Sequence, residues 1–398
     1  MPTPKPIPPR EARPLWKLRA LTSLAALVLA LASFEVACRV IDVDFNPNPN
    51  WRFHEALGWT QEISKQYDYE VEGRTVRVSF NAAGFRDVEH ALAKSVGTKR
   101  LVVIGDSFSE AIQVNLDETY WTLLGARMSE QGTPWEVINL GVGDFGTAQA
   151  LLALQEFGMA YAPDFVLVQS FALNDICNNT LEHAGLCKST NDDYRPYFVS
   201  DGPGIRPAWT QPFRHWLRSN LITFGVLEKA YLTWVAGASN ENATAAEARE
   251  AAPHPLLGVY SPPSQQHPAI SRGWEITESL LREIDKICRQ QGIPWALVLP
   301  PFEARVTPSG WKSFSQGYPG LVMVRDYPET RFAALLQKLD APFIPLLTAF
   351  ENNADTVLPF IGGHLSPAGH AIAATEIFAH LEKRGLVGTA SAPPAPTD

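Results

Sequence analysis

Three polar side chains that could together transfer an acyl group lie beside predicted strands and helices. Ser107 follows the predicted strand 101–104, Asn174 follows the predicted strand 164–170, and His364 precedes the last predicted helix. A serine hydroxyl is a weak nucleophile until an imidazole accepts its proton. The negative oxygen that forms on the attacked carbonyl needs fixed hydrogen-bond donors, each worth about 2.7–4 kcal/mol. These residue types therefore indicate cleavage or transfer of an ester.

The same residues belong to four short motifs that occur in order along the chain. The motifs are GDSFS at 105–109, NLGVGDFGT at 139–147, FALNDI at 171–176 and GGHLSPAGH at 362–370. Their arrangement over 100–384 resembles that of the SGNH (GDSL-type) hydrolases, in the membrane-anchored bacterial form. The resemblance implies a serine esterase or acyl-transferring enzyme. It also implies a flavodoxin-like three-layer α/β/α sandwich around a central parallel sheet.

The resemblance assigns a role to each matching residue. Ser107 would be the nucleophile and His364 the base. The oxyanion hole would contain the backbone N–H of Ser107, a backbone N–H from Gly143 or Asp144, and the side-chain amide of Asn174. The family glycine usually follows the asparagine of the second motif by five positions, which Asp144 occupies here. The role needs only a backbone N–H, so Asp144 can fill it.

One expected group is absent. The family often has an acid two or three residues before the histidine, but Gly362 and Ile361 occupy those positions. Either a backbone carbonyl orients His364, so that a Ser–His dyad suffices, or an acid from elsewhere, such as Asp355, completes a triad.

Two other classes of protein compete with this interpretation. The second motif contains Gly141-x-Gly143-x-x-Gly146, the form of a dinucleotide fingerprint. That fingerprint expects an acid at the end of the next strand, whereas the nearest acid lies at its start. A non-catalytic, membrane-anchored binding protein with the same fold is favoured by the missing acid and opposed by the joint presence of serine, asparagine and histidine. We expect no metal and no cofactor.

The elements that must position these residues are predicted from residue 100 onward. Short apolar strands alternate with helices, the pattern of a parallel sheet covered on both faces. The predicted strands are 101–104, 135–140, 164–170, 294–299 and 342–347, and the predicted helices are 118–131, 147–161, 274–291, 328–339 and 367–384. Open parallel sheets have their sites at the carboxyl ends of the strands. Residues 178–268 interrupt the pattern and are predicted to be an insertion with one amphipathic helix at 213–234.

Charge is distributed unevenly along the 398 residues. The chain has 33 basic and 42 acidic side chains, a net charge of −9, but residues 1–39 hold six basic groups and two acidic ones. The remainder is therefore strongly acidic, which argues against a nucleic-acid partner. The run 20–38 has one charge, Glu35, and would be about 28 Å long as a helix, close to a hydrocarbon core of about 30 Å.

We therefore predict a single-pass anchor in the inner cell membrane, with the C-terminal body periplasmic or extracellular. A small-residue sequence at 30–32 leaves a removed signal peptide as the alternative. The predicted segments are a basic Pro-rich cytoplasmic tail (1–19), a transmembrane helix or signal anchor (20–39), a strand or hairpin lead-in packed on the main domain (40–99), the hydrolase-like domain (100–386) and a disordered tail (387–398).

Two further expectations follow from export. Cys177 and Cys187 are ten positions apart in a loop-like stretch and are predicted to form a disulfide in an oxidising compartment. The location favours an ester substrate such as an O-acylated envelope or secreted polysaccharide, with water or a sugar hydroxyl as the acceptor. An esterase and an O-acyltransferase would use the same residues. The sequence does not determine the oligomeric state.

Overall fold

The computed structural model describes residues 15–41, 51–181, 194–201, 204–239 and 255–387. The chain divides into two compact units, one of Met1–Pro47 with Trp216–Glu241 and one of Asn48–His215 with Asn242–Asp398. The predicted insertion is thus shared between the two units. Cys187, most of the Pro-rich head and nearly all of the predicted disordered tail lie outside the described residues.

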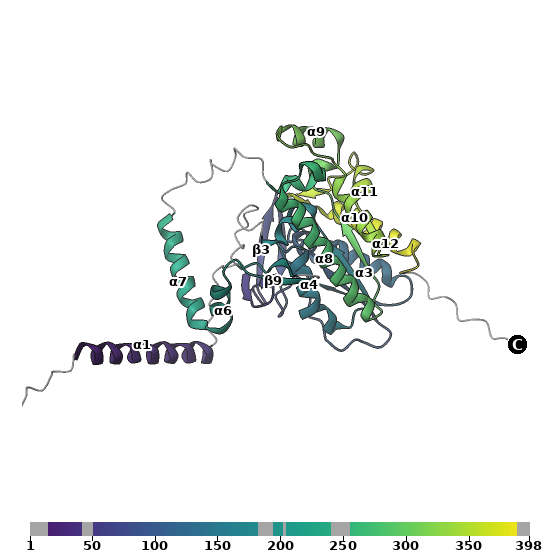
Figure 1. Ribbon diagram of the computed structural model, residues 1–398. Helices are drawn as coiled ribbons and strands as arrows, with labels where there is room; N and C mark the ends of the chain where they lie inside the picture. Colours follow the sequence, from purple (N-terminus) through teal and green to yellow (C-terminus); the bar gives the residue numbers. More distant parts are fainter. Residues whose placement is uncertain (1–14, 42–50, 182–193, 202–203, 240–254, 388–398) are drawn as a thin grey trace, which may run out of the picture. The chain divides into compact units, whose positions relative to one another are not determined.

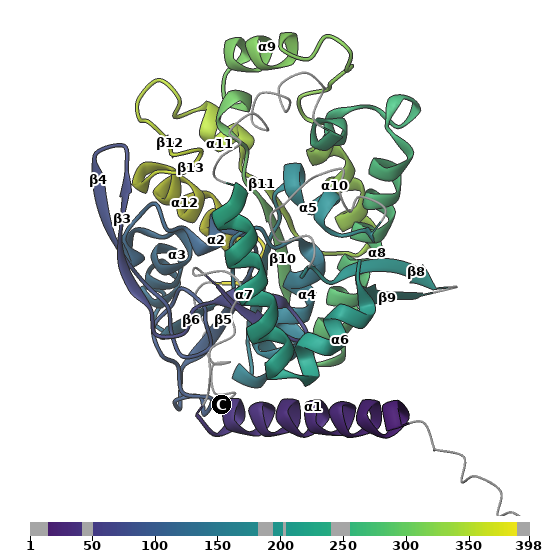
Figure 2. The ribbon, with the colours of Figure 1, turned by 90° about the vertical axis from the view of Figure 1, so that its left-hand side faces the viewer.

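A five-stranded parallel sheet forms the centre of the larger unit (Figures 1 and 2). Its order is β11-β10-β7-β5-β6, and every neighbouring pair is parallel. By position in the chain this is the order 2-1-3-4-5 of flavodoxin-like folds. The strands are β5 (Lys99–Ile104), β6 (Trp135–Asn139), β7 (Phe165–Gln169), β10 (Trp295–Leu299) and β11 (Phe343–Pro345).

Helices cover both faces of this sheet, because successive strand residues point to opposite sides. Val102 and Ile104 belong to the core beneath α4 (Thr147–Glu156), α8 (Pro268–Gln290) and α10 (Tyr327–Lys338). Leu101 and Val103 belong to the core beneath α3 (Tyr120–Ser129) and α12 (Pro367–Lys383). The predicted three-layer α/β/α sandwich is confirmed. Shorter helices beside these layers are α2 (Ser107–Glu110), α5 (Ala172–Asn178), α9 (Pro308–Gln316) and α11 (Leu347–Glu351).

The segment before the sheet forms two hairpins that belong to the larger unit. They are built from β1 (Trp51–His54), β2 (Gly58–Gln61), β3 (Gln66–Val71) and β4 (Arg74–Ser79). Trp59 and Phe85, from this segment, are buried in the same core as Val102. The segment therefore shares the core of the sheet domain. Two later hairpins are β8 (Tyr197–Asp201) with β9 (Gly204–Ala208), and β12 (Phe360–Ile361) with β13 (His364–Leu365).

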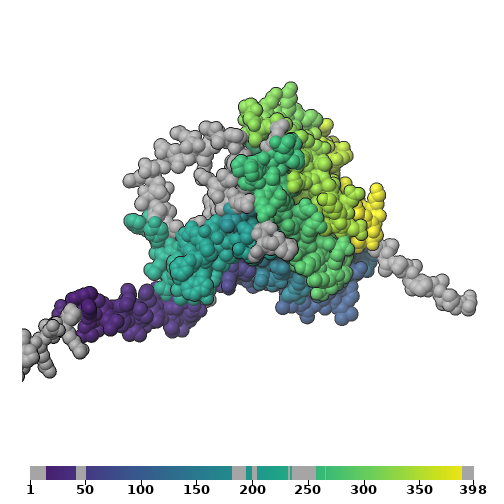
Figure 3. All heavy atoms as spheres, in the orientation of Figure 1, coloured from purple at the N-terminus to yellow at the C-terminus, as the bar shows by residue number. Residues whose placement is uncertain are grey.

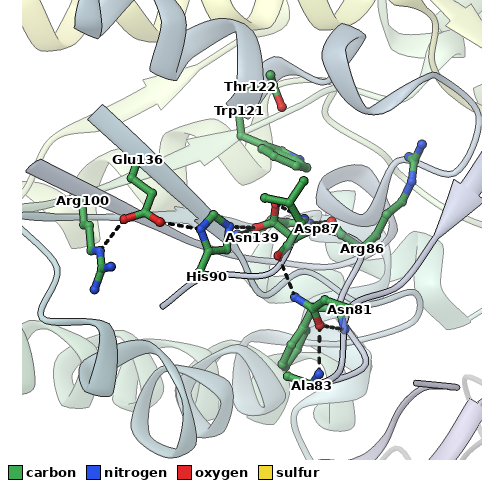
Figure 4. A network of polar contacts seen from close by, with 12 residues as sticks. Asn81, Ala83, Arg86, Asp87, His90, Arg100, Trp121, Thr122, Glu136 and Asn139 are labelled. Carbon is green, nitrogen blue, oxygen red and sulfur yellow. Dashed lines mark hydrogen bonds and ion pairs between the residues drawn. The ribbon is translucent and has the colours of Figure 1, made fainter. Parts of the chain in front are cut away.

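A chain of charged groups, buried except for Glu136, ties this segment to the edge of the sheet (Figure 4). His90 Nε2 lies 3.0 Å from Asp87 Oδ2, and His90 Nδ1 lies 2.7 Å from Glu136 Oε1. Glu136 also accepts a hydrogen bond of 2.7 Å from Arg100 Nε, and Asp87 accepts one of 2.7 Å from the N–H of Asn139. Because Glu136 and Asn139 lie on β6, the network joins the segment after β4 to the edge strand.

This network predicts a pH-dependent contribution to stability. Burial alone would lower the pKa of His90, but the Asp87 and Glu136 carboxylates outweigh it and raise the pKa above 6.5. The folded state therefore holds the proton more tightly than the unfolded state. The stabilisation is fully present below about pH 6.5 and is lost as the pH rises through the raised pKa. Replacing His90 by Gln should cost about 1–3 kcal/mol at pH 6 and less at pH 9.

Urea unfolding of the wild type and the variant at both pH values measures this difference. His380→Gln is the matched control, because His380 is about one-third exposed and its ion pair among the described residues is with Glu376 on its own helix. That control should change the free energy of unfolding by no more than about 0.5 kcal/mol at either pH. An equal loss at pH 6 and pH 9 in His90→Gln would contradict a role for the imidazolium.

The smaller unit contains the apolar N-terminal helix and part of the insertion. Helix α1 (Leu15–Val40) is long and apolar enough to cross a membrane, with a mean hydropathy of 2.0 over its best 18 residues. Little of that stretch is buried, and Figure 3 shows most of α1 (purple) uncovered. The single helix expected at 213–234 is instead two, α6 (Pro212–Asn220) and α7 (Ile222–Ser239).

Candidate active site

Ser107 lies where β5 ends and the short helix α2 begins. The preceding Asp106 caps this helix by accepting a 2.9 Å hydrogen bond from the N–H of Phe108. Asp106 and Phe108 are buried, whereas Ser107 is partly exposed. The connections after β5 and β7 lead to opposite faces of the sheet, and such a switch point is where flavodoxin-like sheets bind ligands.

His364 lies near the C-terminal end of the domain sequence and contacts Ser107. Its Nε2 lies 2.9 Å from Ser107 Oγ, a hydrogen-bonding distance at which the imidazole can accept the hydroxyl proton. The imidazole ring packs against the ring of Phe108, with 5.2 Å between centroids. The structure thus brings together the serine and the histidine that the motifs single out.

A backbone carbonyl contacts the other imidazole nitrogen. His364 Nδ1 lies 3.2 Å from the carbonyl oxygen of Gly362, in the turn between β12 and β13. Gly362 and Gly363 have φ values of +54° and +77°, and two successive left-handed residues form the type of tight turn that favours glycine. The turn therefore favours glycine at position 362, one of the two positions where the family often has an acid. Asp355 is exposed and makes no hydrogen bond to His364.

These contacts predict opposite results for two substitutions. Replacing His364 by Ala should lower kcat roughly 10⁴-fold, because Ser107 loses its proton acceptor. Replacing Asp355 by Asn should change kcat/KM by no more than about twofold, as for other exposed positions. Initial rates on one chromogenic ester measure both. A loss in Asp355→Asn as deep as that in His364→Ala would show that this carboxylate orients the imidazole.

Asn174, at the start of α5, reaches the serine turn from the neighbouring strand. Its Nδ2 donates a 3.0 Å hydrogen bond to Asp106 Oδ2. A side-chain amide has a second N–H on the same nitrogen, which can serve another acceptor. Burial raises the pKa of Asp106, and the bonds from Phe108 and Asn174 oppose that rise. Asp106 therefore connects the serine turn to the predicted amide donor.

The two backbone donors predicted from the second motif differ in their contacts. The N–H of Gly143 donates a 3.0 Å hydrogen bond to Glu110 Oε2, so a buried carboxylate engages it. Asp144 has φ +65°, a left-handed conformation that aspartate tolerates better than most residues. Arg195, which is fully buried, binds the Asp144 carboxylate at 2.8 Å and its carbonyl at 2.7 Å. The turn thus holds aspartate where the family has glycine.

Glu110 is a buried acid that the sequence did not single out. It lies three residues after Ser107 and accepts hydrogen bonds from Gly143 N–H and Gln61 Nε2. Burial raises its pKa to about 7, although Gln61 and Arg86 oppose the rise. Its charge therefore changes near neutral pH, next to the turn that carries Asp144.

The segment before the sheet contacts both the serine helix and the histidine turn. Sequence reasoning did not assign these contacts to it. Arg86 is 1% exposed and donates hydrogen bonds to the carbonyls of Glu110, Ala111 and Val114, at and after the end of α2. On the histidine side, Glu72 accepts a 2.8 Å hydrogen bond from the N–H of Gly362. A buried arginine is rare without a partner, but its partners here are carbonyls with no sequence signature.

The cysteines are described in part. Cys177 is disulfide-bonded, and Cys38 and Cys288 are free and buried. Burial raises the pKa of Cys288 to about 12, so its thiol is unreactive. Cys187 lies outside the described residues, so its pairing with Cys177 stays a prediction.

Comparison with known proteins finds similarity only among solved structures. No family model matches the chain, and no curated protein matches it. Similar structures include an acetyl xylan esterase, AlAXEase, at 14% identity over 70% of this chain and 98% of that chain, with a TM-score of 0.36. TesA is 13% identical over 72% and 99%, with a TM-score of 0.36. The acetylxylan esterase Axe2 from Geobacillus stearothermophilus is 15% identical over 72% and 96%, also at 0.36.

Proposed function

We propose that the protein is a serine esterase of the SGNH (GDSL) type. The observation that carries this proposal is the 2.9 Å approach of His364 Nε2 to Ser107 Oγ at the carboxyl end of a parallel sheet. The resemblance of the four motifs supports the same assignment. The substrate class is an ester, and we favour an ester in which the acyl group is carried on a hydroxyl oxygen of the substrate.

The reaction proceeds in two halves. Ser107 Oγ attacks the ester carbonyl carbon while His364 Nε2 accepts the hydroxyl proton. The alcohol then leaves with that proton, and the acyl group stays on Ser107. Water, or a sugar hydroxyl in a transferase, gives its proton to His364, attacks the acyl-enzyme and restores the serine. The Gly362 carbonyl holds the imidazole by its Nδ1–H and lies where it can stabilise the imidazolium between these steps.

In this proposal three donors would stabilise the negative oxygen. The N–H of Ser107 begins α2 and so has no partner within that helix. Asn174 contributes its second amide N–H, and Asp144 its backbone N–H from the left-handed turn. The second motif offers Gly143 as the other candidate, and Glu110 accepts the N–H of that residue.

We propose that the reaction takes place outside the cytoplasm. Helix α1 could span a membrane, and the basic groups before its uncharged run favour a cytoplasmic N-terminus. The larger unit would then face the periplasm or the exterior, where acylated polysaccharides are available.

A substrate screen of the full-length protein in detergent tests the proposal. We expect hydrolysis of p-nitrophenyl acetate and acetate release from an acetylated polysaccharide, and a long-chain ester tests the acyl-length preference. Adding a sugar acceptor separates the two reactions, because a transferase forms an acetylated sugar whereas an esterase releases acetate. Absence of both products for every ester, with the protein folded, would favour a non-catalytic binding protein.

A further inference from the structure

The smaller unit joins the apolar helix α1 to α7 through one acidic residue. Glu35, on α1, caps the first turn of α7 by accepting hydrogen bonds from the N–H of Ile222 at 3.1 Å and of Thr223 at 2.7 Å. Arg39 donates to Glu35 at 2.8 Å and to the carbonyl of Asn220, just before α7, at 2.8 Å. These contacts explain why an acidic residue, Glu35, occurs within the apolar helix. They also anchor the start of α7 to α1.

The junction lies near one end of α1. Glu35 precedes the last residue, Val40, by five positions, about 7.5 Å along a helix axis. The uncharged run lies on the other side of Glu35. In a bilayer spanned by α1, Glu35 and Arg39 therefore lie where the hydrocarbon meets the headgroups.

From this junction, helix α7 runs transverse to α1. In Figures 1 and 2, α7 rises across the axis of α1 instead of running beside it. With 18 residues it is about 27 Å long. A helix that starts at the membrane surface and runs transverse to the spanning helix extends along that surface.

One face of α7 has the composition of a membrane-interface helix. Leu227, Tyr231 and Trp234 are 57%, 59% and 71% exposed, and their spacing of four and three residues places them on one side. The Tyr231 and Trp234 rings lie 6.3 Å apart. Elsewhere on the helix, Glu228 forms a buried two-bond pair with Arg218 of α6, at 2.7 and 2.9 Å. Glu228 and Arg218 therefore satisfy each other within the unit. The exposed side of α7 that carries Leu227, Tyr231 and Trp234 is aromatic and aliphatic.

We propose that the α7 aromatic face, formed by Leu227, Tyr231 and Trp234, lies in the headgroup region of the bilayer that α1 spans. Tyr and Trp concentrate at that depth because each has an apolar ring and a polar tip. The protein would then contact the membrane through an interfacial helix as well as through the span. The inference rests on the proposed anchoring by α1 and is independent of the proposed reaction.

Lipid-carried quenchers test the contact on the full-length protein. A cysteine in place of Tyr231 is labelled with an environment-sensitive NBD fluorophore; Cys38 and Cys288 are buried, and the parent protein gives the background. The labelled protein is reconstituted in phosphatidylcholine–phosphatidylglycerol vesicles with or without lipids brominated near the headgroup. We expect at least about twofold quenching and a blue-shifted emission.

Two matched variants complete the design. Ser313→Cys, exposed on α9 of the larger unit, should show no lipid quenching. Leu27→Cys, exposed in the middle of α1, should be quenched best by lipids brominated deep in the chains. Fluorophosphonate labelling of Ser107 in the same samples reports the proposed reaction separately.

Four results would overturn the inference. If the label at 27 is quenched and the label at 231 responds only to aqueous iodide, the anchor holds but α7 lies in water. If the label at 231 responds to neither quencher, protein covers the face. If its depth equals that of the label at 27, α7 enters the hydrocarbon core. If neither label is quenched by lipid, α1 does not span and the inference fails with it.

Discussion

Replacing Ser107 by Ala is expected to lower kcat for ester cleavage roughly 10⁴-fold or more, because the acyl-enzyme can no longer form. The Ser107 hydroxyl is the group that lies 2.9 Å from His364 Nε2, and no other serine contacts that nitrogen among the described residues. A fluorophosphonate probe should label the wild type at Ser107 and leave Ser107→Ala unlabelled. Initial rates with p-nitrophenyl acetate and mass spectrometry of the labelled peptide measure the two effects.

Ser109→Ala is the matched control on the same short helix. The Ser109 hydroxyl is fully buried and bonds Tyr120 Oη at 2.7 Å and Gln169 Oε1 at 2.9 Å. Its removal should cost about 1 kcal/mol of stability and leave labelling at Ser107 intact. Equal labelling of Ser107→Ala and the wild type would exclude Ser107 as the nucleophile. Absence of labelling from both would favour a binding protein.

Replacing Arg86 by Leu is expected to lower the free energy of unfolding by about 3–5 kcal/mol, the scale for losing one partner of a buried charged contact. Its guanidinium satisfies three carbonyls at and after the end of α2, and leaving them unpaired costs about 1–3 kcal/mol each at most. Burial lowers the pKa of Arg86 only to about 10, so it is charged at neutral pH. Urea unfolding measures the loss.

Arg77→Leu tests whether the effect is specific to the buried arginine. Arg77 lies on β4 of the same segment, but its pair with Asp68 at 2.9 Å is more than half exposed on both sides. Such pairs contribute about 0–1 kcal/mol. Similar losses in the two variants would mean that removing charge from this segment, and not the contact with α2, destabilises the protein. Residual activity in Arg86→Leu, compared at equal folded fraction, reports displacement of Ser107.

The central sheet could be predicted because its strands are local patterns. The predicted run 101–104 lies within β5, and each of the other four predicted strands contains the observed one. The alternation of buried strands with helices indicates parallel order without knowledge of any contact. Boundaries differ by a few residues, as at the expected helix 147–161, which ends at Glu156 and continues as a short 3₁₀ turn, Gly158–Tyr161.

The helix expected at 213–234 shows where local reasoning ends. Its apolar spacing is continuous in the sequence, yet the structure separates α6 from α7 at Leu221. The carboxylate that caps the new start, Glu35, lies 187 and 188 residues earlier in the chain than the N–H groups it binds. No local pattern encodes that partner.

The sequence by itself determined the sheet class, the apolar N-terminal helix and the three side chains that could do chemistry, because each depends on residue type or short-range spacing. Only the tertiary structure decided that the Gly362 carbonyl contacts His364 and that Glu110 engages the N–H of Gly143. It also decided that Arg86 holds the serine helix. These are directional contacts of about 3 Å, most of them between distant parts of the chain, and packing of the whole domain sets their geometry.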